Sequence, residues 1–359
     1  MTPGGAAPGR GPFLDWKGLL GIFISLGLLY FVFRDVDPGE VWGHVRSADP
    51  WLLAAAGSLA TVVFPLRALR WKPLLRPTHP SSRFRPRFAA TTIGFMANNL
   101  LPARVGEFAR AYALSRLEPV RVSASFGSLV VERMFDGLTV VLFLLAALVW
   151  PSFPAVSGRD FGTPALAMGA AFAVAVAVLL ATVARPDRAV RRFEAVAARL
   201  LPLPVRRPVV DAMEAFLDGI AALRDVRLVS AAAGWSVVIW LTGALAFWVG
   251  FLAFDIRVPF VTAVFLQSVV SLAVAIPSAP GFFGVFEAAA RVGLVQVWGV
   301  APGPALGFAI GFHLAGFFPV TFIGLYYVWR LGLTWREVED SETAVETAVE
   351  AGSPGAGRE

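Results

Sequence analysis

Residues 98–111 read NNLLPARVGEFARA and predict an interrupted membrane helix. An apolar run from Phe88 leads into this stretch, but that run is too short to cross a bilayer, because a spanning helix needs about 20 residues. Pro102 lacks a backbone donor and Gly106 accepts backbone angles that other residues avoid, so both favour a break. We therefore expect residues 88–116 to enter the membrane, turn at Pro102 and Gly106, and leave on the same side.

A second stretch has the same chemistry. Residues 276–291 read IPSAPGFFGVFEAAAR, so proline again ends an apolar helix, and glycine and glutamate again precede a helix of small residues that carries an arginine. If the two stretches enter from opposite faces, the chain contains an inverted repeat, and in transporters such paired breaks lie next to the substrate site. The alternative is that the prolines mark ordinary helix ends in loops. The expected hinge residues are Pro102, Gly106, Pro277, Pro280, Gly281 and Gly284.

The composition is typical of a membrane protein. Of 359 residues, 57% are hydrophobic and only 16% are charged, whereas soluble domains carry about 25% charged residues. The chain has no cysteine, which excludes thiolate metal sites, and it has no phosphate-binding loop motif. We expect no cofactor and no metal. The formal net charge of +6 does not indicate nucleic acid, because the basic residues lie in loops between apolar spans, as the positive-inside rule requires.

The predicted fold class is all-α, a polytopic integral membrane helix bundle with two re-entrant or broken helix hairpins in an inverted repeat. We expect residues 1–16 to be disordered, residues 17–331 to form the transmembrane domain and residues 332–359 to be a disordered acidic tail. The broken elements are residues 88–116 and 258–300, and each could instead be a pair of full crossings. The predicted spans are residues 17–34, 51–69, 133–150, 164–184, 228–254 and 304–329, with a cytoplasmic amphipathic segment at residues 185–227.

Charge predicts the orientation. Seven basic residues and no acid lie between Arg67 and Arg87, which places the loop around residues 70–87 in the cytoplasm. Counting spans from that loop puts both termini in the cytoplasm of a multi-pass protein of the cell membrane.

Charged and polar residues at the two breaks are the candidate substrate-binding residues. A broken helix in hydrocarbon is tolerated only where protein or a water-filled cavity satisfies the freed backbone groups, and arginine there can form charge-assisted hydrogen bonds to phosphate. The glutamates would pair with these arginines, or bind a cationic head group or a proton. The candidates are Asn98, Asn99, Arg104, Glu107, Arg110, Glu287 and Arg291.

Three further candidates form one constellation, Glu132, Arg133 and Asp136. The two acids are four residues apart, so they share a helix face, and Arg133 can pair with Asp136. Ionisable residues at such depth are costly, which favours a functional role. A charged helix start at the cytoplasmic interface is the alternative, and the two interpretations weigh equally. Weaker candidates are Gln267, Ser271 and His313.

Together these residues resemble the lysylphosphatidylglycerol synthase transmembrane-region family over about residues 17–331. One signature combines residues 98–111 with the Glu132-Arg133-x-x-Asp136 group. The other is Pro277-x-x-Pro280-Gly281-x-x-Gly284-x-x-Glu287. In multiple peptide resistance factors this membrane region is similar to a flippase that moves aminoacylated phospholipid between leaflets, while a separate soluble domain makes the lipid. The resemblance here is to stand-alone members without the synthase domain, so the substrate need not be lysylphosphatidylglycerol.

The resulting hypothesis is a membrane lipid flippase or transporter without enzymatic activity. It would move a phospholipid or another lipid-linked head group between leaflets, through a polar cavity between the two broken helices. A membrane-embedded lipid-modifying transferase and a secondary transporter of a small anion are the alternatives. The expected partners are membrane phospholipids or a lipid-linked substrate, with no nucleic acid and with homo-oligomerisation left open.

Overall fold

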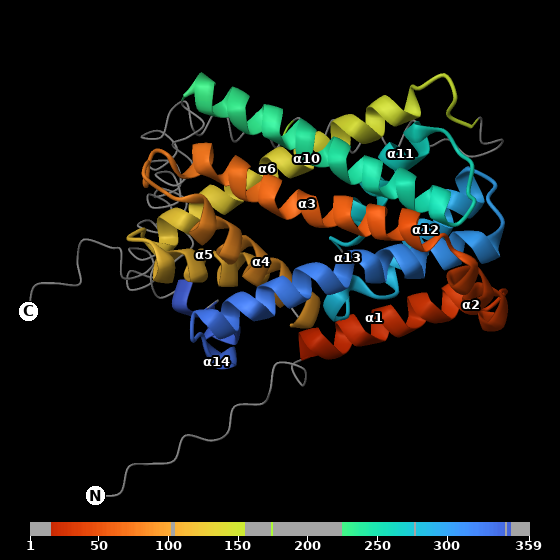
Figure 1. Cartoon of the computed structure of the whole chain (residues 1–359), viewed down its shortest axis with the longest axis horizontal. Helices are drawn as coiled ribbons and strands as arrows, with labels where there is room; N and C mark the ends of the chain where they lie inside the picture. Colours follow the sequence, from red (N-terminus) through yellow and green to blue (C-terminus); the bar gives the residue numbers. More distant parts are fainter. Residues whose placement is uncertain are drawn as a thin grey trace, which may run out of the picture.

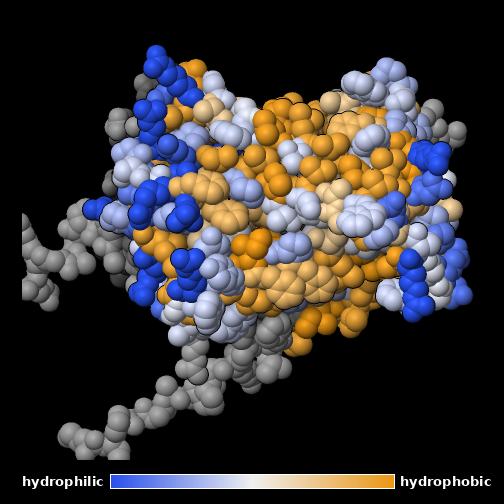
Figure 2. All heavy atoms as spheres, viewed as in Figure 1, coloured by the Kyte–Doolittle hydropathy of each residue, from blue (hydrophilic) through white to orange (hydrophobic). Residues whose placement is uncertain are grey.

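The computed structural model describes residues 16–101, 105–154, 174, 225–275, 278–341 and 343–345, and every element assigned in these ranges is helical. The long helices lie lengthwise, side by side (Figure 1). A broad apolar band covers the visible face, and charged residues gather at its two ends (Figure 2). The elements are α1 (Trp16–Phe33), α2 (Pro38–Ser47), α3 (Pro50–Leu75), α4 (Phe84–Leu100), α5 (Gly106–Leu117), α6 (Val122–Leu148), α10 (Val226–Ala253), α11 (Phe260–Ala273), η4 (Pro280–Phe282), α12 (Val285–Arg291), η5 (Val292–Val297), α13 (Pro302–Arg330) and α14 (Trp335–Glu339).

Three of the described helices, α3, α10 and α13, are long and apolar enough to cross a membrane on their own. Helix α3 packs against both of the others. Their bounds overlap the spans predicted at residues 51–69, 228–254 and 304–329, although α3 continues to Leu75. Helix α1 matches the span predicted at residues 17–34, and α1 with α2 forms a pair bent by 85° that would make a fourth span. The chain is therefore a multi-pass membrane protein.

Helix α6 starts earlier than predicted. It begins at Val122, whereas the sequence predicts a start at residue 133, where the charged residues stand. The prediction follows from the cost of ionisable groups in hydrocarbon. In the structure those residues lie inside the helix, on a face packed against α3 and α5, so the helix continues through them. The span predicted at residues 164–184, except Val174, and residues 185–224 of the amphipathic segment lie outside the described residues.

The first broken element consists of two short helices, α4 and α5, that pack against each other. Two glycines allow the close approach: a Cβ atom on Gly106 would lie 2.1 Å from the carbonyl oxygen of Gly94. The Asn98 side chain closes the pair, because its Oδ1 accepts a hydrogen bond from the Gly106 N–H at 2.8 Å. The break predicted from residues 98–111 is present, and its entry and exit on one face of the membrane stay a prediction.

The second broken element joins α11, η4, α12 and the π-helical turn η5. Three residues here have left-handed backbone angles, Gly281 (φ +72°), Phe282 (φ +62°) and Gly284 (φ +85°). Such angles favour glycine and end a regular helix. The turn η4 packs on α4, so the two broken elements meet near the middle of the molecule (Figure 1). Their relation by an inverted repeat stays a prediction.

The glycines of α13 make a close helix contact. Gly307 and Gly311 are four residues apart, a spacing that predicts close packing. A Cβ atom on Gly307 would lie 2.8 Å from His44 Cβ, and one on Gly311 would lie 2.5 Å from the Phe254 ring. These glycines therefore bring α2 and the end of α10 onto α13.

A short helix follows α13. The sequence predicts disorder from residue 332, whereas Trp335–Glu339 form helix α14. The Thr334 backbone N–H and hydroxyl donate to Glu337 at 2.8 and 2.9 Å, and the Glu337 N–H donates back to the Thr334 hydroxyl. These bonds hold the pKa of Glu337 below its ordinary value and start a helix that the acidic composition did not predict.

We expect Gly94→Ala to destabilise the α4–α5 pair. A Cβ atom at this position would lie 2.6 Å from the Gly106 carbonyl oxygen and 2.8 Å from Arg110 Cβ, and overpacking of this kind costs about 1–3 kcal/mol. Thermal unfolding of the purified protein in detergent measures the effect. Gly27→Ala in α1 is the control, because an added Cβ there meets no atom within 4 Å. An equal Tm for both variants would contradict the close packing of α4 on α5.

Candidate functional site

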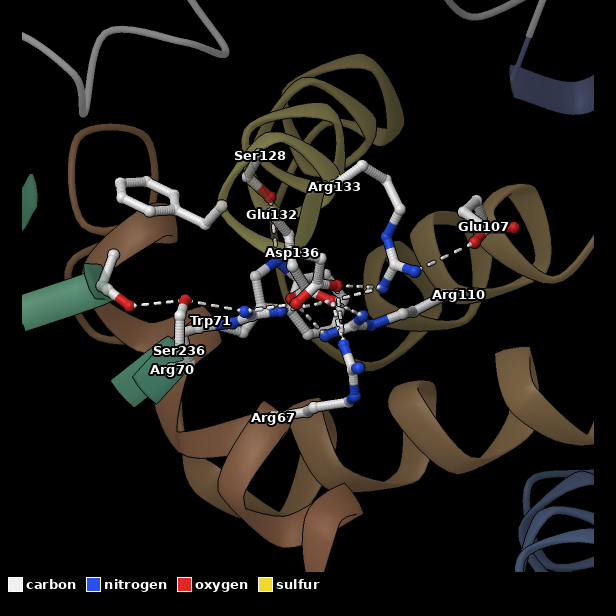
Figure 3. Close-up of polar contacts among 12 residues, drawn as sticks. Arg67, Arg70, Trp71, Glu107, Arg110, Ser128, Glu132, Arg133, Asp136 and Ser236 are labelled. Atoms are coloured by element: carbon white, nitrogen blue, oxygen red, sulfur yellow. Dashed lines mark hydrogen bonds and ion pairs between the residues drawn. The ribbon is translucent and has the colours of Figure 1, made fainter. Parts of the chain in front are cut away.

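A buried cluster of ionic side chains joins three elements. Helix α3 contributes Arg67 and Arg70, α5 contributes Arg110, and α6 contributes the acids and one arginine; Figure 3 shows the four guanidinium groups converging on the two carboxylates. Glu132 stands ten residues after the start of α6, which is about 15 Å along the helix. Glu132 and Arg70 are both 0% exposed. The cluster therefore lies in the interior of the bundle and away from its polar end. Its members are Arg67, Arg70, Arg110, Glu132, Arg133 and Asp136.

Glu132 is the centre of the first half of the cluster. Arg110 holds it with two parallel hydrogen bonds, Nη1 to Oε1 at 2.6 Å and Nη2 to Oε2 at 3.0 Å. Arg133 donates to Oε1 at 2.9 Å, and Arg70 Nη2 lies 3.3 Å from the same oxygen. A bidentate arginine–carboxylate pair fixes both side chains in one geometry, so α5 is tied to α6 at this point.

Asp136 is the centre of the second half. Arg67 and Arg70 donate to its two oxygens at 2.8 and 2.7 Å, and Arg133 lies 3.2 Å away, as the sequence predicts from their spacing. The Trp240 indole N–H of α10 donates to Asp136 at 3.1 Å. Four helices thus share this network, α3, α5, α6 and α10.

Two side chains orient the arginines of the cluster. The Trp71 ring lies 4.0 Å from the Arg110 guanidinium carbon and its indole N–H donates to Ser128 at 2.8 Å. The Ser236 hydroxyl of α10 accepts a hydrogen bond from Arg70 at 2.9 Å. A guanidinium over an indole ring is a favourable cation–π arrangement, so the arginine planes are held in place before any ligand binds.

The cluster carries more positive than negative charge. Guanidinium groups stay protonated in proteins. Three buried ones and that of Arg133, which is 40% exposed, face two buried carboxylates and Glu107, which is 30% exposed and lies 3.8 Å from Arg133. One positive charge is therefore left over. Four N–H-bearing atoms have no hydrogen-bond partner in the described part of the chain, Arg67 Nε, Arg70 Nε, Arg70 Nη2 and Arg110 Nε. Both the surplus charge and the unused donors are of the kind that attracts an anion.

A cavity of about 200 Å³ adjoins the cluster. Arg67 of the cluster and Trp240, which donates to Asp136, both line it, and the remaining walls come from α3, α10, α11 and α13. The cavity is lined by Ala60, Val63, Arg67, Ile239, Trp240, Gly243, Ala246, Phe247, Gln267, Ser271 and Phe312.

The second break forms a separate polar group. Glu287 is 3% exposed; its Oε2 accepts the Gly284 N–H at 2.6 Å and its Oε1 lies 2.7 Å from His313 Nδ1 on α13. Arg291 donates to the last carbonyls of α1, at Phe31 and Val32, and lies 3.3 Å from Asp35. Among their described contacts, neither Glu287 nor Arg291 reaches the buried cluster, so the candidates of the second break form a group separate from those of the first.

The other predicted residues have these positions. Asn99 donates to the Thr321 hydroxyl of α13 at 2.8 Å, and Asn98 accepts the Gly106 N–H, so both make structural contacts within the broken element or to α13. Among the hinge residues, Gly106, Pro280, Gly281 and Gly284 lie at the two breaks. Pro102, Arg104 and Pro277 lie outside the described residues.

Sequence reasoning missed Arg67 and Arg70. Both were counted as part of the basic run that marks a cytoplasmic loop, but they lie inside α3 and are 8% and 0% exposed. Their three-residue spacing matches the four-residue spacing of the two acids on α6, and this complementarity is the signal that could have paired the two helices. Trp240 carries no such signal, whereas Gln267 was among the weaker candidates from the sequence. Within the described ranges no group of His, Asp and Glu side chains is placed to hold a metal ion.

Comparison with known proteins places these features in one family. The lysylphosphatidylglycerol synthase transmembrane region matches residues 18–324. Glycosyltransferase AglD of Haloferax volcanii is 30% identical over 324 residues, which cover 82% of this chain and 51% of that protein. A UPF0104 membrane protein of Methanothermobacter thermautotrophicus is 24% identical over 303 residues, 80% of this chain and 85% of that protein.

The chain spans about half the length of AglD, and no solved structure matches it significantly. The family match extends from α1 into α13 and so includes both broken elements and the buried cluster. The chain belongs to the lysylphosphatidylglycerol synthase transmembrane-region family.

Proposed function

We propose that this protein is a membrane lipid flippase, which moves a lipid with a phosphate-bearing head group between the leaflets. The observation that carries the proposal is the excess of guanidinium groups in the buried cluster. Arginine inside a membrane is costly and marks a substrate or ion pathway by default. The four guanidinium groups of the cluster outnumber the three carboxylates that they contact, which leaves one positive charge without a counter-ion among the described residues.

Phosphate is the anion that fits this excess. The orphaned N–H groups of Arg67, Arg70 and Arg110 come from three side chains around one centre. Arginine binds phosphate through several charge-assisted hydrogen bonds, and each is about twice as strong as a neutral one. A phosphate lipid would therefore complete the hydrogen bonding of the cluster while its chains stay in the surrounding bilayer.

In this proposal, the two broken elements are the segments that change conformation during transport. In transporters, discontinuous helices that meet near the bilayer midplane form the substrate site, and one half rocks against the other. Here η4 packs on α4, and the left-handed angles at Gly281 and Gly284 allow α12 to pivot. The lipid in the family's name, and the glycosyltransferase in the name of the relative AglD, support a role in lipid or glycan-carrier processes.

A transferase that acts on a lipid-linked glycan is the second candidate, and the similarity to a named glycosyltransferase favours it. The chain matches only about half of that protein. Incubation of purified protein with labelled lipid and sugar donors separates the two candidates, because a transferase makes a new product and a flippase returns its lipid unchanged.

We expect Arg67→Gln to slow lipid translocation about ten- to hundredfold, because one charge-assisted hydrogen bond is worth about 1.5–3 kcal/mol. Asp136 keeps Arg70 at 2.7 Å and Arg133 at 3.2 Å in this variant, so the fold should persist. The measurement is dithionite quenching of fluorescent phosphatidylglycerol in reconstituted vesicles.

The control for this variant is Arg257→Gln, whose side chain is 85% exposed and pairs only with Asp255 among the described residues. Equal translocation by both variants, with monodisperse protein in each case, would refute the role of the cluster. Inhibition of the wild type by free phosphate alone would instead favour transport of a small anion.

We expect the α3–α4 connection to face the cytoplasm and the α10–α11 connection to face outward. The two connections lie at opposite ends of the bundle (Figure 1). The chain has no cysteine, so Ser81→Cys in the α3–α4 connection and Arg257→Cys in the α10–α11 connection each introduce a single exposed thiol. A membrane-impermeant maleimide added to intact cells should label position 257 at once and position 81 only after permeabilisation. The reverse pattern would invert the proposed orientation of the protein in the cell membrane.

A further inference from the structure

The cavity beside the cluster combines apolar walls with a few polar side chains. It lies between α3, α10, α11 and α13, and most of its walls are apolar. Its polar side chains are Arg67, Gln267 and Ser271, with Trp240, Phe247 and Phe312 supplying aromatic walls. A few placed polar groups in an apolar, aromatic pocket are typical of a site for a small organic group.

Only one of the two polar atoms of the Gln267 amide has a hydrogen-bond partner in the described part of the chain. Its Nε2 donates to the Trp240 carbonyl at 3.2 Å, while its buried Oε1 has no hydrogen-bond partner in the described part of the chain. The residue is 8% exposed. A buried acceptor without a donor is costly, so this position calls for a ligand that donates a hydrogen bond.

Arg67 needs a ligand that accepts a hydrogen bond. It is 8% exposed, and its Nε, a donor, also lacks a partner among the described residues. The group that both donates and accepts is a hydroxyl. The Ser271 hydroxyl also lines the cavity, and it can either donate or accept a hydrogen bond.

The lining also excludes one kind of head group. Its residues include no aspartate or glutamate, so a cationic amine would gain no counter-ion in the cavity, and Arg67 would repel it. Size sets a further limit. A volume of about 200 Å³ corresponds to several water molecules at ~30 Å³ each, which suits a glycerol or a single sugar ring.

We infer that this cavity binds the hydroxylated head group of the transported lipid, a glycerol or a sugar, while the phosphate of the same lipid lies at the arginine cluster. Arg67 joins the two subsites, since it lines the cavity and contacts Asp136. The inference rests on the proposed lipid function and adds the class of head group. It separates a hydroxylated lipid phosphate from both a bare lipid phosphate and an aminoacylated one.

Gly243 on α10 gives a specific way to fill the cavity. A Cβ atom there would lie 2.9 Å from Gln267 Oε1 and 3.0 Å from Nε2, so Gly243→Ala displaces the amide. Gly234→Ala on the same helix is the matched control, because an added Cβ there meets no atom within 4 Å. Gln267→Leu removes the amide itself at nearly constant volume.

The test compares binding of three dioleoyl lipids to purified protein in detergent by native mass spectrometry. The lipids are phosphatidylglycerol, phosphatidic acid and phosphatidylethanolamine, and free glycerol 1-phosphate serves as competitor. We expect the wild type and Gly234→Ala to prefer phosphatidylglycerol about five- to tenfold over phosphatidic acid, the worth of one or two hydrogen bonds. Gln267→Leu and Gly243→Ala should lose that preference and still bind phosphatidic acid.

Each result of this test either supports or overturns a stated part of the inference. Equal binding of phosphatidylglycerol and phosphatidic acid by the wild type, or a preference that survives both cavity variants, overturns the inference while translocation by the cluster can still stand. A preference for phosphatidylethanolamine overturns it too. Competition by glycerol 1-phosphate as strong as that by the lipid would assign the subsite to a soluble ligand and overturn the lipid part. Absence of translocation in vesicles, with the phosphatidylglycerol preference intact, would refute the flippase and keep the subsite.

Discussion

The structure depends on the pairing of Glu132 and Asp136 with arginines from two other helices. An unpaired ion at that depth would not be tolerated in hydrocarbon, so α3, α5 and α6 must meet at one point for any of these residues to be buried. The bidentate bond from Arg110 sets the position of α5, and through the close glycine contact it sets α4 as well. Buried ion pairs add little net stability, but leaving a buried ion without any partner is strongly destabilising. The cluster therefore specifies the arrangement of the bundle more than it strengthens it.

Apolar patterning was sufficient for the long hydrophobic helices. The ranges of α1, α3, α10 and α13 follow from hydropathy, and the breaks at the two Pro/Gly stretches follow from backbone chemistry alone. The early start of α6 could not be predicted in the same way, because its first turns are small and polar and its charged residues read as an end. The charged residues of α6 can be buried only because arginines on neighbouring helices pair with them. The sequence of α6 alone does not show which residues those helices place against it.

Some residues of the site could likewise be identified from the sequence, and others could not. Glu132, Arg133 and Asp136 were identifiable because their spacing puts the acids on one face. Arg67 and Arg70 were hidden by a competing explanation, since the positive-inside rule accounts for basic residues at the end of a span. That rule concerns residues in loops, and these two lie within α3. Trp240 and Gln267 reach the site from α10 and α11, through contacts between helices far apart in the chain.

The two breaks share a backbone pattern and differ in chemistry. Arg110 follows the first break and holds a buried glutamate, whereas Arg291 follows the second and binds the last carbonyls of α1. Glu287 is occupied by Gly284 and His313, so it satisfies the interrupted backbone and links α12 to α13. Through Gln267 of α11, the second element supplies one polar wall of the cavity. The surplus positive charge comes from the first element and its neighbours. Under the proposed function, phosphate would bind at this cluster, whose arginines Trp71 and Ser236 orient, and the second element would control access to it.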